Sequence, residues 1–513
     1  MKKNFFFMAA LLVAMVGCNK EPQEEGNGLS ASDKVYMTFS IKTPTTRSAT
    51  DDAGNTNSNA NPDYEVGKDY ENTIKWVDIV LTNNDSYILQ KNVTPTGVID
   101  NKYIAAFNSL DLEANAKYDV YIYANCHAPE SKDLHATSNA TIDQMTKENE
   151  FWMTTAYEAK SVTLPTNMSI YTSPSSPLNL GVHPVERSMA RIDIAPYKDY
   201  DFEIEDTEVY VTLTEATIIN ESVDFYMLRR VSDDGTNNDW TVGGVENPNN
   251  YVVDVDWEMK SEGFKDALRV PIGQGKHFTK HMWWPEKFSW IALPNTSGNS
   301  DAWDNDEKDY KIWWYCKENT IPGIENQQKG FTTAVVFRGE ISTTIDSLNE
   351  AMEDGENLYM FENVLYGPWS AVKDAAAKDD APFTLKEAVA QVIKYGLVET
   401  DLNAEESVRL LRENGFTGFS RNNDGKYFTY YYYWIRHNDN GIKGEMGNME
   451  FAVVRNNVYK LCVENIYKLG HPTPGNPDPD PENPFDPDES LNYYFNVTVD
   501  VLPWTVRVNN IEF

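Results

Sequence analysis

The C-terminus limits the fold of this chain more than any other segment, because a strand-patterned tail follows a proline-rich tether. The tether, PTPGNPDPDPENPFDPDES, makes up nearly all of the linker assigned to 471–490. Its prolines lack backbone N–H donors and favour extended conformations, so it can join neither a helix nor a sheet and acts as a semi-rigid spacer. Residues 491–513 follow as LNYYFNVTVDVLPWTVRVNNIEF, with apolar side chains at every second position. This period of two predicts β-strands.

Two alternating runs make up the tail. The apolar face of the first run is formed by Tyr493, Phe495, Val497, Val499 and Val501. That of the second run, after a break at Leu502-Pro503, is formed by Trp504, Val506 and Val508. A strand on a tether is suited to pairing with another molecule, so the tail is a candidate donor strand that we expect to be loosely docked, or not docked, in the uncut chain. The alternative is a closing hairpin or edge strand of the chain's own domain.

The N-terminus has the layout of an export signal. Two lysines are followed by an apolar stretch over residues 5–16, which is too short for a stable membrane-spanning helix, and then by Gly17 and Cys18. An export signal that ends on cysteine resembles a bacterial lipoprotein signal, so residues 1–18 are predicted to be that signal. Cys18 is then predicted to carry the lipid, which includes palmitate. The alternative is an ordinary secretory signal with a coincidental cysteine.

A second strand pattern lies shortly after the signal. Its apolar face is formed by Val35, Met37, Phe39 and Ile41, which alternate with polar or tyrosine residues. A segment almost without apolar residues follows, and Arg47 within it is an accessible cleavage point for a trypsin-like protease, with Ser48 as the new terminus. The alternative is a solvated loop arginine with no role. We therefore treat 19–47 as a propeptide with a removable strand.

These two ends of the chain suggest one hypothesis. A strand removed at the N-terminus would leave a groove, and the tail of another copy could fill it with main-chain hydrogen bonds and alternate side chains. Such a head-to-tail contact does not close on itself, so it would build a filament.

Composition excludes several functional classes. The formal net charge of the 513-residue chain is -35, which argues against binding nucleic acid or an anionic membrane surface by charge. Besides Cys18, the cysteines are Cys126, Cys316 and Cys462. An odd number spaced this widely is neither a disulfide framework nor a metal site. We interpret them as buried small hydrophobic residues, and leave open whether one pair is bonded.

The body of the chain reads as a series of short strands with Asn, Asp and Gly turns, which predicts an all-β fold of sandwich domains. The first sandwich is assigned to 48–186 and begins with a strand expected over 71–81. The second is assigned to 187–470, with strands expected over 427–436 and 449–460. A few short helices are predicted in an insertion near 374–415, with a capping box that begins at Thr384 and a helix over 404–413 that stops before Gly415. They are expected to decorate the sandwich.

Enzyme signatures are absent from the sequence. It contains none of the hydrolase, zinc-protease, phosphate-binding or dinucleotide-binding motifs. His277 and His281 are four residues apart, but glycines before them favour a strand or loop, so no metal site is predicted. The turns Asp424-Gly425 and Asp439-Asn440-Gly441 lack the first and twelfth ligands of a calcium loop. We predict neither catalysis nor a cofactor.

Aromatic clusters support an alternative function. They are Trp283-Trp284, Trp290, Trp313-Trp314 and 430–434. Exposed aromatic rings stack on sugars, so a glycan-binding surface lipoprotein is the second hypothesis. Their alternation inside strands, however, favours packing in the core.

Several segments resemble a known family. They include YYYYWIRHND at 430–439, GNMEFAVVRNNVYKL at 447–461, the 185–194 segment, YMFEN at 359–363, NPDY at 61–64 and VLPWTV at 501–506. Together they resemble the major fimbrial shaft subunits (fimbrillins) of Bacteroidales type V pili. The 374–415 insertion does not align with that pattern.

The resemblance implies two transthyretin-like β-sandwich domains, delivery to the cell outer membrane as a lipoprotein precursor, cleavage by a trypsin-like protease and assembly into an extracellular fimbrium. Carried onto this chain, Cys18 is lipidated, the Arg47–Ser48 bond is cut, 35–41 is discarded and 491–513 is the donor. Lys42 leaves the choice of bond open. The implied partners are other copies of this chain, anchor and tip subunits, the protease, and host or bacterial surface receptors. A tip or accessory subunit is the alternative role.

Overall fold

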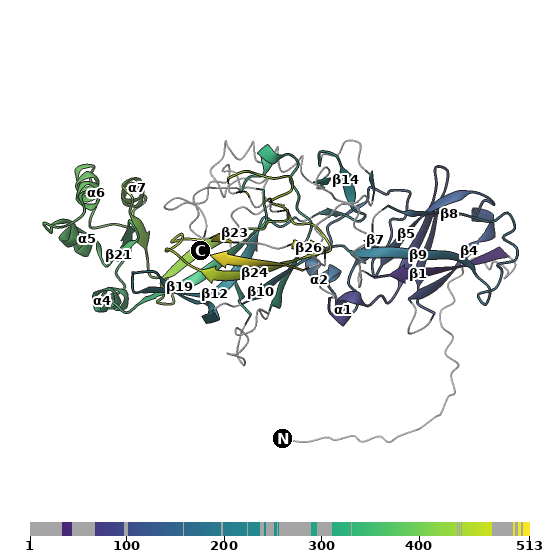
Figure 1. Cartoon of the computed structure of the whole chain (residues 1–513), viewed down its shortest axis with the longest axis horizontal. Coiled ribbons are helices and arrows are strands. Elements are labelled where there is room, and N and C mark those ends of the chain that lie inside the picture. The colour runs from purple at the N-terminus through teal and green to yellow at the C-terminus, as the bar shows by residue number, and fades with distance from the viewer. Residues whose placement is uncertain are drawn as a thin grey trace, which may run out of the picture.

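The structure is a computed structural model, and Figure 1 shows the whole chain. The residues that it describes are 33–43, 67–96, 101–156, 158–195, 198–222, 224–235, 241–242, 251–253, 255, 289–294, 310–329, 331–438, 440, 442, 444–474, 496–497, 501–503 and 506–512. Strands dominate them, so the predicted all-β class is confirmed.

An eight-stranded sheet forms the first sandwich, which lies at the right of Figure 1. Its strands are β1 (Lys34–Lys42), β2 (Val77–Thr82), β3 (Tyr87–Val93), β4 (Lys102–Asn108), β5 (Lys117–Ala124), β7 (Met153–Thr155), β8 (Lys160–Thr163) and β9 (Leu178–Arg187). The order is β3-β2-β5-β7-β9-β1-β4, with β8 on β5. The sheet curls until its two ends approach each other at a bridge between Pro95 and Tyr103, and the curl encloses one hydrophobic core. Short helices α1 (Asp69–Asn72) and α2 (Ile142–Met145) complete this part.

Two sheets form the second sandwich. The first contains β10 (Ala190–Ala195), β18 (Lys311–Cys316), β24 (Asn457–Asn465) and the tail strands. The second contains β11 (Asp201–Ile204), β12 (Val209–Ile219), β17 (Ile291–Ala292), β19 (Ala334–Thr343) and β23 (Phe428–Trp434). Alternate residues of β10 and β24 meet those of β12, β19 and β23 in a single core. The remaining short strands are β6 (Thr137–Ser138), β13 (Phe225–Tyr226), β14 (Arg230–Ser232), β15 (Thr241–Val242) and β16 (Tyr251–Val252).

The helical insertion is larger than predicted and has a core of its own. It contains α4 (Asp346–Asp354), α5 (Trp369–Ala376), α6 (Phe383–Lys394) and α7 (Glu405–Glu413) around a small sheet of β20 (Leu358–Phe361), β21 (Val364–Tyr366) and β22 (Thr417–Phe419). Aromatic and aliphatic side chains from β20, α5, α6 and α7 form a separate cluster, whereas Ala351 of α4 and Phe419 of β22 join the core of the second sandwich. The insertion lies at the end of the molecule opposite the first sandwich (Figure 1).

Within this insertion, one helix start is predicted wrongly and one helix is predicted well. Helix α6 begins at Phe383 after Pro382, and the Thr384 hydroxyl bonds the Glu362 carboxylate, so there is no capping box at Thr384. Pro382 favours this start because it is the N-cap, where the missing N–H of proline costs no helical hydrogen bond. Helix α7 ends as expected before Gly415, whose φ of +87° suits glycine.

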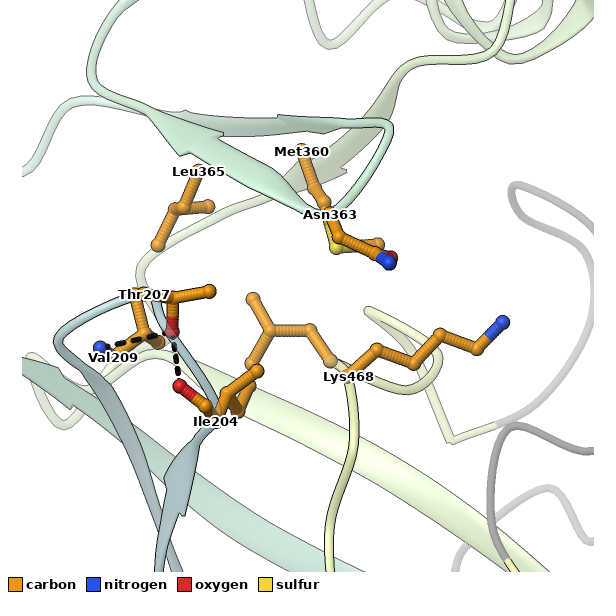
Figure 2. A pocket seen from close by; sticks show the side chains of 8 residues that line it. Ile204, Thr207, Val209, Met360, Asn363, Leu365 and Lys468 are labelled. Carbon is orange, nitrogen blue, oxygen red and sulfur yellow. Dashed lines mark hydrogen bonds between the residues drawn. The ribbon is translucent and has the colours of Figure 1, made fainter.

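A small cavity of about 10 Å³ lies where the insertion meets the second sandwich. Figure 2 shows its lining from the turn between β11 and β12, from the β20–β21 hairpin and from Lys468. The Thr207 hydroxyl fixes that turn, because it donates to the Ile204 carbonyl at 2.7 Å and accepts from the Val209 N–H at 3.2 Å. The cavity holds about one water molecule at most, so these residues are closely packed around it.

A buried charged network joins the two sandwiches. Glu71 of α1 accepts from Arg191 of β10 at 2.9 and 3.1 Å and from the Tyr315 hydroxyl at 2.6 Å. The same Arg191 donates to both oxygens of Asp193 at 2.7 and 2.8 Å. The Arg187 guanidinium also donates to the Glu71 carbonyl. The expected strand over 71–81 was wrong at its start, because Glu71 belongs to this helix and β2 begins at Val77.

Burial answers the cysteine prediction and part of the aromatic one. All five residues of 430–434, and Trp313, are buried in the cores, so these aromatic residues offer no open platform for sugar rings. Cys126, Cys316 and Cys462 are buried free thiols. The strand expected over 449–460 begins later, at Asn457, because the preceding residues form a loop in which Phe451 bridges to Arg436 and Val453 to Asn319. Among the described residues, no helix has the length and apolarity needed to cross a bilayer.

Candidate strand-exchange site

Strand β1 is paired along both of its edges. It runs antiparallel to β4 over seven residue pairs, from Lys34 opposite Asn108 to Ser40 opposite Lys102. It runs parallel to β9 from Met37 opposite Leu178 to Lys42 opposite Pro184. Removing this strand would therefore leave two facing rows of unpaired main-chain donors and acceptors. Such rows are a template for another strand.

The apolar face of β1 is wholly inside the first core. The exposed fractions are 2% for Val35, 0% for Met37, 0% for Phe39 and 3% for Ile41. The Phe39 ring lies 6.3 Å from the Phe107 ring and 5.7 Å from the His183 ring, measured between centroids. The alternation predicted from sequence for these four residues is confirmed as the burial pattern of the strand.

The burial of these four side chains makes an empty groove unstable. Burying a side chain of this size contributes about 1.5–3 kcal/mol, so the face contributes roughly 6–12 kcal/mol in total. The covalent link to the rest of the chain holds β1 in place. If the link were cut, a competing strand with the same alternation could replace it without a change of fold.

His183 lies beside β1, on the neighbouring strand β9, opposite Ile41. Its ring is 1% exposed, and its Nε2 atom has no hydrogen-bond partner among the described residues. Burial, with the positive charge of Lys160 as a smaller cause, lowers the pKa of the imidazole to about 4 from the ordinary 6.5. The groove therefore contains a histidine that is neutral at pH 7.

The first prediction concerns acid stability of the uncut chain. Below pH 6.5 the unfolded chain gains a proton at His183 that the folded chain does not accept until about pH 4. The free energy of unfolding should thus fall by roughly 3 kcal/mol between these pH values because of this one group. Urea unfolding at pH 7, 5.5 and 4.5 measures it, with His183→Gln as the control whose slope with pH should be smaller. Equal slopes in the two proteins would contradict the prediction.

The tail is paired with its own chain, which differs from our expectation. Strand β27 (Val506–Glu512) runs parallel to β24, from Val458 opposite Val506 onward. Two short strands accompany it, β25 (Asn496–Val497) and β26 (Val501–Pro503). Without these tail strands, this edge of β24 would be unpaired. A segment of the same chain pairs there readily because its local concentration is high. The pairing counts against a tail that is undocked in the uncut chain.

Some of the remaining predicted site residues lie in the part of the chain that the structure describes, and the others lie outside it. Val497, Val501, Val506 and Val508 lie within the tail strands. Cys18, Arg47, Ser48, Tyr493, Phe495, Val499 and Trp504 lie outside the described residues, as do His277, His281 and 283–284. The described parts hold no cluster of three His, Cys, Asp or Glu side chains that could bind a metal.

Sequence reasoning missed the walls of the groove. Strands β4 and β9 hold β1, but neither was predicted as its partner. Strand β9 shows why, because its first part pairs with β1 and its last three residues pair with β7. Its exposed and buried residues follow no single alternation along its length. Pairing between strands this far apart in the chain has no local signal.

The fold and this groove define a class, namely an all-β protein in which an N-terminal strand is held between two neighbours. Residues 426–510 match the family model described as major fimbrial subunit protein type IV, fimbrillin, C-terminal. The resemblance to fimbrillins is thus confirmed for this C-terminal part of the chain.

Solved structures give weak similarities. A fimbrilin from Porphyromonas gingivalis W83 is 12% identical with a TM-score of 0.34, over 94% of this chain and 98% of that one. The tip fimbrial protein Mfa3 from Porphyromonas gingivalis, solved with a C-terminal truncation, is 9% identical with a TM-score of 0.31, over 84% and 94%. Both TM-scores are below 0.5, so the resemblance rests on the family model alone. A search of curated protein sequences finds no match.

Proposed function

We propose that this chain is a shaft subunit of a fimbrium, exported as a lipoprotein through Cys18 and cut after Arg47. In this proposal the cut releases 19–47, and the tail of another copy enters the groove that β1 leaves. The observation that carries the proposal is the placement of β1. It is a strand buried between two neighbours, and it lies before the predicted cleavage bond.

A shaft subunit needs an acceptor and a donor in the same chain. The groove under β1 supplies the acceptor. The tail supplies the donor, and its backbone is able to pair parallel to a neighbouring strand, as β27 does with β24 and β1 does with β9. A tip subunit needs the acceptor alone, and a glycan-binding lipoprotein needs neither. The presence of both therefore favours the shaft.

The elongated shape suits head-to-tail growth. Figure 1 shows the first sandwich at one end, the second in the middle and the insertion at the other end. The buried network of Glu71, Arg191 and Asp193 ties the two sandwiches together, so force along a filament would act on this network. The net charge of -35 opposes lateral clumping of identical filaments.

The second prediction tests the proposed function directly. Brief digestion of the Cys18→Ser chain with an Arg-specific protease should create a new terminus at Ser48. A heat-sensitive ladder should then form on non-boiled gels, because freed β1 can be displaced by the tail of another copy. Deleting 491–513 should leave the cut intact and remove the ladder. Arg47→Ala is the matched control that keeps the tail and should stay uncut and monomeric. A clean cut that yields only monomer would favour a tip subunit or a glycan-binding protein.

A further inference from the structure

We infer that the tail enters the β1 groove in one register. In it, Leu491, Tyr493, Phe495, Val497 and Val499 take the places of Val35, Met37, Phe39, Ile41 and Thr43. This inference rests on the proposed function, because it assumes that strand exchange occurs. It adds the residue that specifies the exchange, Phe495.

The groove restricts the side chains that it accepts. Five successive inward positions are buried, since Thr43 is only 6% exposed and continues the face formed by the four apolar residues of β1. A charged side chain at any of the five positions would lose its hydration without gaining a partner. The place of Phe39 is also large, because the rings of Phe107 and His183 border it. A small residue there would leave a cavity.

These restrictions can be tested against each aromatic residue in the two alternating runs of the tail. Placing Tyr493 at the Phe39 position puts Glu489 at the Val35 position, and placing Trp504 there puts Asp500 at the same position. Each of these registers buries a carboxylate. Placing Tyr494 there turns the polar face of the tail inward.

Placing Phe495 at the Phe39 position is different. It puts an apolar or aromatic residue at each of the five buried positions, and it leaves Ser490, the end of the tether, just outside the groove. This register assumes that the tail runs in the direction of β1. The reverse direction would run parallel to β4 and antiparallel to β9, so it would exchange the two hydrogen-bond patterns that β1 makes with its neighbours.

The register fixes which outward residues face each other across the new contact. Ser40 of β1 lies opposite Lys102 of β4, Thr38 opposite Ile104 and Tyr36 opposite Ala106. In the inferred register Asn496 takes the place of Ser40, so it should face Lys102 of the acceptor subunit. Opposite residues in antiparallel strands have Cα atoms about 4.5–5.5 Å apart, within the range in which disulfides form.

Cysteine pairs test this register. Chains with Cys18→Ser and Asn496→Cys would carry Lys102→Cys, Ile104→Cys or Ala106→Cys, and each would be cut, assembled and oxidised. We expect a boiled, non-reducing gel to show a ladder only for the Lys102→Cys pair, and reduction to abolish it. The native thiols Cys126, Cys316 and Cys462 are buried and should not compete.

The outcomes separate the register from the proposed function. A ladder from the Ile104→Cys pair would mean a shift by two residues or a reversed strand, and would overturn the register. Assembly on non-boiled gels with no disulfide ladder from any pair would overturn it too. Failure of the parent Cys18→Ser chain to assemble at all would instead refute strand exchange itself.

Discussion

Replacing Phe39 by alanine is expected to lower the free energy of unfolding of the uncut chain by about 3–5 kcal/mol, because it leaves a cavity in the first core. Phe39 is fully buried against Phe107 and His183. Once β1 has been released, however, the same substitution should have no effect on the assembled filament. Urea unfolding of the precursor and the heat stability of the ladder measure the two effects.

The substitution of Phe495 by alanine should show the opposite behaviour. It should change the free energy of unfolding of the uncut chain little, because β1 fills the groove there. After cleavage it should weaken or abolish the ladder. Tyr494→Ala is the matched control, because its side chain falls on the other face of the tail. If Phe39→Ala lowered the heat stability of the filament as much as that of the precursor, β1 would still be present in the filament, and exchange would be refuted.

A second large effect is expected at the junction of the two sandwiches. Arg191→Met should lower the free energy of unfolding by about 3–5 kcal/mol, because it leaves Glu71 and Asp193 buried without their shared cation. All three side chains are at most 3% exposed. Thermal unfolding or urea titration at pH 7 measures the loss.

Two further variants show whether charge is the cause. Arg409 on α7 also pairs with two carboxylates, Glu406 and Glu413, but in solvent, so Arg409→Met should change stability little. Adding Glu71→Gln and Asp193→Asn to Arg191→Met should recover part of the loss, because no unpaired charge then remains buried. A loss as large for Arg409→Met, or no recovery, would contradict the assignment of the effect to buried charge.

The strand and helix predictions that succeeded depended on local patterns. Alternation identified β1, and the apolar period with a following glycine identified α7. The failures occurred where local signals compete. A Thr-x-x-Glu pattern at Thr384 mimicked a capping box although Pro382 begins the helix, and Glu71 was read into a strand although its carboxylate binds Arg191, 120 residues later.

The candidate strand-exchange site could likewise be predicted only in part. Residues 33–43 and the tail could be recognised as matching strands from sequence, because side-chain alternation at period two is a local property of the backbone. Their placement could not. Only the tertiary structure sets β1 between β4 and β9, puts His183 beside Phe39, and pairs the tail with β24 in the isolated chain. Strand pairing and the burial of charge depend on contacts between residues far apart in the chain, and these contacts exist only after the chain has folded.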